Sequence, residues 1–112
     1  MRYCLELDQF ARQVIAKNFN MAVPWYLSAS YAYYKEAESI ISDEFFDSIC
    51  RILKMYWSAI DHPHKYLIRE DSLDSGTGYY LDYDLLPLRT RSATQRLILV
   101  AQGKIPLYPT KS

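Results

Sequence analysis

The side chains best suited to chemistry lie in the middle of the chain, where a tyrosine pair is followed by two acids. Tyr33 and Tyr34 are adjacent, and Asp43 and Asp47 come after them. Aromatic rings bind flat groups by stacking, and carboxylates accept hydrogen bonds from hydroxyl and amide groups. Adjacent helical residues point about 100° apart, so packing between helices explains one of the two tyrosines more easily than both. These residues are therefore a candidate binding site.

Helix electrostatics offers a second explanation for the two acids. Acids in the first turn of a helix stabilise its dipole by about 0.3–1 kcal/mol each at low salt. Asp47 also precedes Arg51 by one helical turn, and such an exposed pair is worth about 0.2–0.5 kcal/mol. Each acid taken alone is explained slightly better by helix stability than by a ligand.

Hydrophobic periodicity predicts two of the helices that would position these residues. Apolar residues recur at helical spacing from Tyr3 to Ile15 and again from Phe45 to Ile60. Ser42 or Asp43 is a suitable N-cap for the later helix. We expect that helix to end at His62-Pro63.

A further helix is predicted between these two, over about 25–38, with Pro24 in its first turn. Its aromatic residues fall on several sides, which a plain hydrophobic core does not explain. Some of them must be partly exposed or meet a ligand or partner. We therefore predict a protein interaction surface formed by Trp25, Tyr26 and Tyr31.

The second half of the chain is predicted to be less regular. Residues 64–88 read as a loop region with a short strand at Tyr79–Tyr83, and 89–112 as a basic helix and tail. The last helix should run from about Ser92 to Gln102, with Gly103 as its stop. The expected fold is a mainly α single domain over 1–112, built on a helix-turn-helix pair within 25–63.

The helix pair resembles the N-terminal NMN-binding domain of bacterial NAD-dependent DNA ligases. In that family a Tyr-Tyr or Tyr-His pair ends one helix, Ile-Ser-Asp follows, and the next helix opens with Glu-Tyr-Asp. Here the matching residues are Tyr33-Tyr34, Ile41-Ser42-Asp43 and Phe45-Phe46-Asp47, with His62-Pro63 where the family has a His-Pro after the second helix. The resemblance covers roughly residues 25–63.

The resemblance implies a nucleotide site that contacts the nicotinamide ring by stacking and the ribose and amide through aspartates. The positions that it assigns to this site are Tyr33, Tyr34, Asp43, Phe46 and Asp47. Phe46 replaces a family tyrosine and Ser39 a usual proline. No lysine lies in the Lys-x-Asp-Gly motif that the ligases use as their nucleophile, so we expect no catalytic residue and no enzyme activity.

The remaining residues point to no other chemistry. His62 and His64 lack further ligands for a metal, and residues 75–78 lack the lysine of a phosphate loop. The net charge is zero, and basic residues after position 88 balance acids in 61–84, so we expect no nucleic-acid partner. The basic residues concerned include Arg89, Arg91 and Arg96.

Cysteine usage and hydropathy indicate the cellular compartment of the protein. Cys4 and Cys50 form neither a disulfide framework nor a metal site and are expected to be reduced, and no membrane span or secretory signal is apparent. We therefore expect a cytoplasmic protein.

Two functions stay open at this point, and neither requires a cofactor. One is a binding module that takes NAD or NMN or assists a separate nucleotidyltransferase. The other is a small phage or mobile-element protein that binds or inhibits a host protein through its aromatic helix surface.

Overall fold

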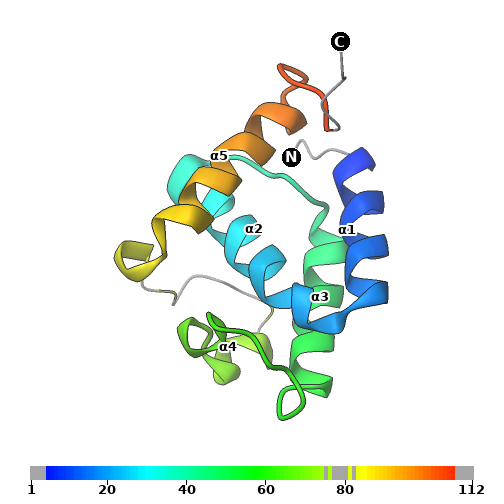
Figure 1. The fold of residues 1–112 in the computed structure, drawn as a ribbon, viewed down its shortest axis with the longest axis vertical. Helices are drawn as coiled ribbons and strands as arrows, with labels where there is room; N and C mark the ends of the chain where they lie inside the picture. The colour runs from blue at the N-terminus through cyan, green and yellow to red at the C-terminus, as the bar shows by residue number, and fades with distance from the viewer. Residues whose placement is uncertain (1–4, 75, 77–80, 82, 108–112) are drawn as a thin grey trace.

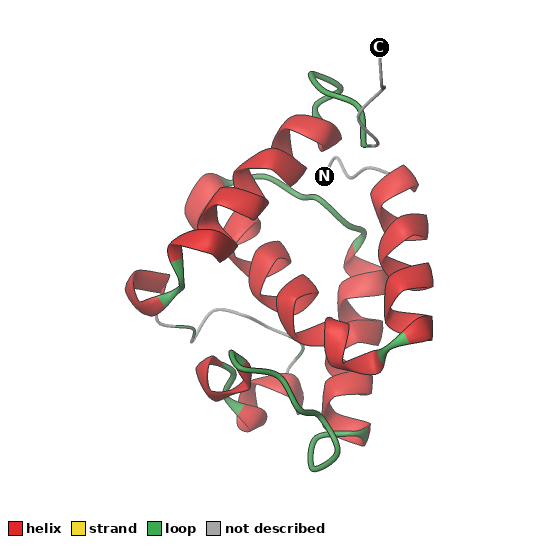
Figure 2. Ribbon diagram, viewed as in Figure 1, coloured by secondary structure: helices red, strands yellow, loops and turns green. Residues whose placement is uncertain are grey.

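The chain folds into a set of packed helices in a computed structural model that describes residues 5–74, 76, 81 and 83–107 (Figure 1). No strand occurs within this part of the chain (Figure 2). The mainly α fold class is therefore confirmed. The elements in chain order are α1 (Leu5–Lys17), the 3₁₀-helix η1 (Phe19–Met21), α2 (Ala22–Glu36), α3 (Asp43–Met55), η2 (Lys65–Leu67), α4 (Glu70–Asp74), η3 (Tyr83–Leu85) and α5 (Leu88–Ala101).

Helix α1 is amphipathic, as predicted, and packs one face into the core. Leu7, Ala11 and Ile15 are buried at helical spacing. Asp8 shares this face and is also buried, with 4% of its surface exposed. Asn18 ends the helix and caps η1, because its side chain accepts a hydrogen bond from the Asn20 N–H.

Helix α2 lies at the centre of the molecule (Figure 1). It contacts both α3 and α5, so it buries residues on several sides, among them Trp25, Tyr26 and Leu27. Pro24 lies in its first turn, as predicted. The helix ends at Ala37, whose φ of 55° is left-handed, and the Glu38 N–H donates to the Ala32 carbonyl across this turn.

Helix α3 begins where the sequence predicts, with Ser42 as its N-cap. The Ser42 hydroxyl accepts a hydrogen bond from the Phe45 N–H at 3.2 Å. The prediction that the helix continues to Ile60 is wrong, because regular structure stops at Met55 and turns follow. Lys65 holds these turns by donating to the carbonyls of Trp57 and Ile60. The apolar pattern from Phe45 to Ile60 therefore covers helix α3 and the turns that follow it.

The region predicted as a loop contains short helices. Helix α4 packs on α3, and the ammonium group of Lys54 pairs with the carboxylate of Asp74 between them. The strand predicted at Tyr79–Tyr83 lies outside the described residues except for Leu81 and Tyr83, and Tyr83 opens η3. Sequence alone missed α4 because it spans just 5 residues of polar composition.

Helix α5 starts earlier than predicted, at Leu88 instead of Ser92, and packs on α2. Pro87 precedes its first residue. Gly103 ends it as predicted, since its φ of 75° lets the Lys104 N–H reach the Leu99 carbonyl at 2.9 Å. None of the described helices has the length and apolar character needed to cross a membrane.

Candidate functional site

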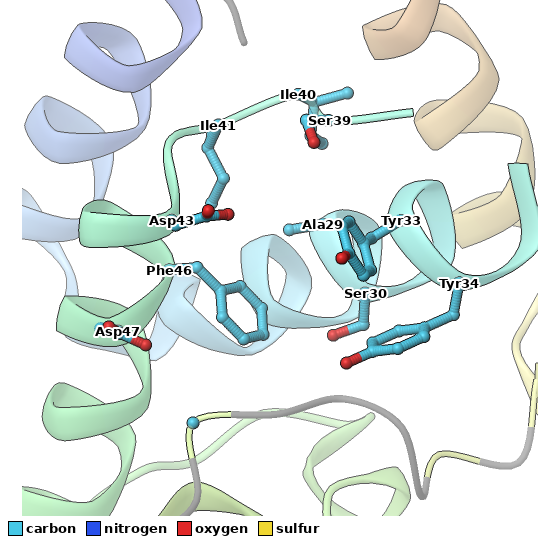
Figure 3. A pocket seen from close by; sticks show the side chains of 11 residues that line it. Ala29, Ser30, Tyr33, Tyr34, Ser39, Ile40, Ile41, Asp43, Phe46 and Asp47 are labelled. Carbon is cyan, nitrogen blue, oxygen red and sulfur yellow. The ribbon is translucent and has the colours of Figure 1, made fainter. Parts of the chain in front are cut away.

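A pocket of about 250 Å³ lies between α2 and α3, and every residue that the ligase resemblance assigns to a nucleotide site lines it. Figure 3 shows α2 supplying Tyr33 and Tyr34 on one side and α3 supplying Phe46 and the two aspartates on the other. The α2–α3 connection and one loop residue complete the wall. The full lining is Ala29, Ser30, Tyr33, Tyr34, Ser39, Ile40, Ile41, Asp43, Phe46, Asp47 and Gly76.

The tyrosine pair stands at the open side of the pocket. Tyr33 and Tyr34 are 45% and 38% exposed, so both reach the surface. Helix packing alone led us to expect one of the two tyrosines there. Their rings meet edge to face, with centroids 4.8 Å apart, and the Tyr34 ring also lies 6.3 Å from that of Tyr83. Such contacts hold aromatic rings in place while leaving ring surface for a ligand.

A buried carboxylate on α1 fixes the start of α3. Asp8 accepts hydrogen bonds from the Ser42 N–H at 2.8 Å and from the Ser42 hydroxyl at 2.5 Å. The same hydroxyl caps α3 at Phe45, so α1, the connection and α3 are joined through one residue. This arrangement sets where Asp43 stands relative to α2.

Asp43 and Asp47 are exposed on successive turns of α3, both at the pocket. Within the described part of the chain neither carboxylate forms an ion pair. The guanidinium of Arg51, which sequence spacing pairs with Asp47, donates instead to the Ser48 hydroxyl at 3.1 Å. The surface pair expected for Asp47 is therefore wrong, and neither carboxylate is paired with a cation of the described residues.

Gly76 brings a loop against Asp47. Its φ is +63°, and a Cβ added there would lie 3.0 Å from the Asp47 Oδ1 atom. A side chain at this position would therefore strain the backbone and push the carboxylate aside.

Phe46 forms the apolar wall of the pocket. Its ring stacks on the buried Tyr26 ring, with centroids 5.4 Å apart and an interplanar angle of 19°. Burial raises the pKa of the Tyr26 hydroxyl, and the nearby Cys50 adds to the effect. Phe46 thus ties the pocket to the core, a role that needs no hydroxyl.

Cys50 lies behind this wall and is a free, buried thiol. Burial raises its pKa to about 12, with a further contribution from the Asp47 carboxylate. The thiol is therefore protonated at neutral pH and is a packing residue, not a nucleophile.

The interaction surface predicted from aromatic residues needs correction. Trp25 is 7% and Tyr26 0% exposed, because α1 and α3 cover them. Trp25 meets Phe10 edge to face at 6.1 Å. Tyr31 alone is partly exposed, and it packs beside Tyr83. These three residues do not form a surface.

His62 and His64 follow the turns after α3 and are not among the residues that line the pocket. His62 Nδ1 accepts a hydrogen bond from the His64 N–H at 3.1 Å, and burial together with His64 lowers the pKa of His62. Among the residues that the structure describes, no three His, Cys, Asp or Glu side chains are grouped to hold a metal ion.

Among the basic residues of α5, Arg91 is engaged with backbone carbonyls. Arg91 donates to the Leu86 and Asp84 carbonyls at 3.1 and 2.7 Å, which ties the start of α5 to the preceding loop. Arg89 and Arg96 are exposed on the same helix.

Sequence reasoning missed two residues of the site region, Asp8 and Ser30. Asp8 stands one turn before Ala11 and two before Ile15, so helical spacing places it on the buried face of α1. Ser30 lies one turn after Tyr26 and one before Tyr33, on the face of α2 that carries the pocket. A polar residue on an apolar or aromatic helix face was the available signal in both cases.

Comparison of the chain with protein-family models, with curated proteins and with solved structures gave no match.

Proposed function

We propose that this chain is a non-catalytic binding module that holds a nicotinamide nucleotide, either NMN or the NMN half of NAD. One observation carries the proposal: the residues that the ligase resemblance assigns to a nucleotide site converge on a single pocket. A resemblance in sequence does not require such convergence. The residues are Tyr33, Tyr34, Asp43, Phe46 and Asp47.

The chemistry of the lining suits a flat cationic ring. The nicotinamide ring is positively charged when joined to ribose, and aromatic faces attract cations within about 6 Å. The carboxylates of Asp43 and Asp47 add negative charge and accept hydrogen bonds from ribose hydroxyls. The lining residues that the structure describes include no Lys, Arg or His, so the phosphate of the ligand would stay at the mouth in solvent.

Binding in this proposal is not followed by group transfer in the same chain. The absence of a Lys-x-Asp-Gly motif leaves no lysine to take up AMP. The module would therefore store or present the nucleotide, and assistance to a separate nucleotidyltransferase follows as a secondary role. The alternative of a host-binding aromatic surface is not favoured, because Trp25 and Tyr26 are buried.

The test is a calorimetric titration with NMN, joined to thermal unfolding at increasing ligand concentration. A ligand that binds the native state alone stabilises it by about 2.7 kcal/mol at a hundred times its Kd. Tyr33→Ala and Asp47→Asn should weaken NMN binding. Tyr66→Ala is the matched control, because Tyr66 is 74% exposed on η2 and does not line the pocket.

AMP provides the ligand control, since it carries ribose and phosphate but no cationic ring. We expect AMP to bind at least tenfold more weakly than NMN. If millimolar NMN leaves the melting temperature and the amide signals of Tyr33, Tyr34 and Asp47 unchanged, the proposal is wrong.

A further inference from the structure

The buried side of the pocket carries a hydroxyl group that forms no hydrogen bond of good geometry with any described residue, the nearby Tyr83 side chain included. Ser30 is 1% exposed and lines the pocket, and its Oγ atom has no partner among the residues that the structure describes. Its backbone carbonyl is satisfied, because the Tyr83 hydroxyl donates to it at 3.3 Å. In Figure 3 the Ser30 hydroxyl reaches toward the space between the Phe46 and Tyr34 rings.

Other hydroxyl groups on helices of this protein behave differently. The buried Thr94 donates to the Thr90 carbonyl one turn back at 2.7 Å, and Ser48 donates to the Glu44 carbonyl at 3.1 Å. This bond to the preceding turn is the usual solution for serine and threonine within a helix. A buried hydroxyl left unpaired lowers stability, so a hydrogen bond supplied by a bound ligand would be favourable at this position.

The lining of the pocket is divided by burial. Ala29, Ile40 and Ile41 are buried and apolar, whereas the tyrosine pair and the two aspartates are exposed at the rim. Ser30 is the one polar side chain among the buried lining residues that the structure describes. A ligand group that enters this depth and needs a hydrogen bond therefore meets the Ser30 Oγ atom.

We propose that Ser30 is a specificity-determining residue whose hydroxyl hydrogen-bonds the carboxamide of the nicotinamide ring. The inference rests on the proposed function and deepens it by assigning the direction in which the ligand enters. The phosphate and ribose stay near the exposed rim, because burying a phosphate without a cation is costly. The carboxamide is the remaining polar group, and a hydroxyl can pair with either its oxygen or its nitrogen.

The experiment compares two ligands with two proteins by calorimetry. The ligands are NMN and its analogue with hydrogen in place of the carboxamide, and the proteins are wild type and Ser30→Ala. We expect wild type to prefer NMN by about tenfold, the effect of one hydrogen bond to a buried group, and Ser30→Ala to lose most of this preference. Ser48→Ala is the control and should keep it, since Ser48 lies on α3 outside the pocket lining.

A second readout uses the protein without ligand. Removing an unpaired buried hydroxyl should leave the melting temperature of Ser30→Ala equal to or above that of wild type. A melting temperature of Ser30→Ala below that of wild type would show that the hydroxyl has a structural partner and would overturn the inference. Equal preference for NMN in wild type and Ser30→Ala would overturn it while leaving the proposed function standing. Absence of NMN binding to wild type would overturn both.

Discussion

The two ends of α2 carry aromatic residues of similar type with opposite environments. Near its start, Trp25 and Tyr26 are 7% and 0% exposed, and near its end Tyr33 and Tyr34 are 45% and 38% exposed. Rings from other helices cover the first pair, Phe10 over Trp25 and Phe46 over Tyr26. The second pair borders the pocket instead. Whether an aromatic residue serves the core or a site is thus decided by which neighbours reach it, not by its own type.

The strongest test of this contrast is a pair of truncations on the one helix. We expect Trp25→Ala to lower the free energy of unfolding by about 3–5 kcal/mol, because it opens a cavity in the core. Tyr33→Ala should lower it by less than about 1 kcal/mol, since it mainly removes the edge contact with Tyr34. Urea unfolding of both variants measures the difference. Similar losses of stability would mean that the two ends of α2 are not distinct.

Helix α3 shows the same division between core and pocket, and Cys50 tests its core side. The pKa of the thiol is raised from 9.0 to about 12, so at pH 8 the native protein holds about a thousandfold less thiolate than the unfolded chain. In a Cys4→Ser background, modification by a disulfide reagent should therefore be about a thousandfold faster in urea than in native buffer. Comparable rates in the two conditions would place Cys50 at the surface.

The raised pKa also fixes the sign of a pH effect on stability. Between pH 9 and pH 12 the unfolded chain releases the Cys50 proton while the native state keeps it. Stability therefore falls as pH rises through this window. Cys50→Ala, again without Cys4, should show a shallower decline over the same range.

Asp8 links the core to the pocket, so its removal should affect both. Asp8→Ala takes away the acceptor for the Ser42 N–H and hydroxyl, and hydrogen bonds to a carboxylate contribute about 1.5–3 kcal/mol. We expect a loss of about 2 kcal/mol in the free energy of unfolding and weaker NMN binding, because Asp43 follows Ser42 directly. Asp8→Asn keeps an acceptor oxygen and should lose less. If Asp8→Asn lost stability and Asp8→Ala did not, the hydrogen bonds from Ser42 to the Asp8 carboxylate would not be what stabilises this region.

Sequence predicted the parts of this fold that depend on local pattern. Helical periodicity identified α1 and α3, Pro24 marked the first turn of α2, and capping chemistry identified Ser42 and Gly103, because these features depend on neighbouring residues. The ligase resemblance selected five of the residues that line the pocket. Sequence could not show which side of α2 the other helices cover, so Trp25 and Tyr26 were misplaced. It likewise could not show contacts between distant segments, such as that of Asp8 with Ser42.

The end of α2 offers the smallest test, and it concerns the backbone that leads into the pocket. Ala37 holds a left-handed conformation, with φ 55° and ψ 36°, which costs an L-residue about 1 kcal/mol relative to glycine. Ala37→Gly should therefore raise the free energy of unfolding by about 0.5–1 kcal/mol, measured in urea. Ala93→Gly is the matched control, because Ala93 is exposed in the interior of α5, where glycine should instead lower stability by about 1 kcal/mol. Opposite signs in the two variants would separate the left-handed end of α2 from an ordinary helical alanine, whereas equal losses would mean that α2 does not end at Ala37.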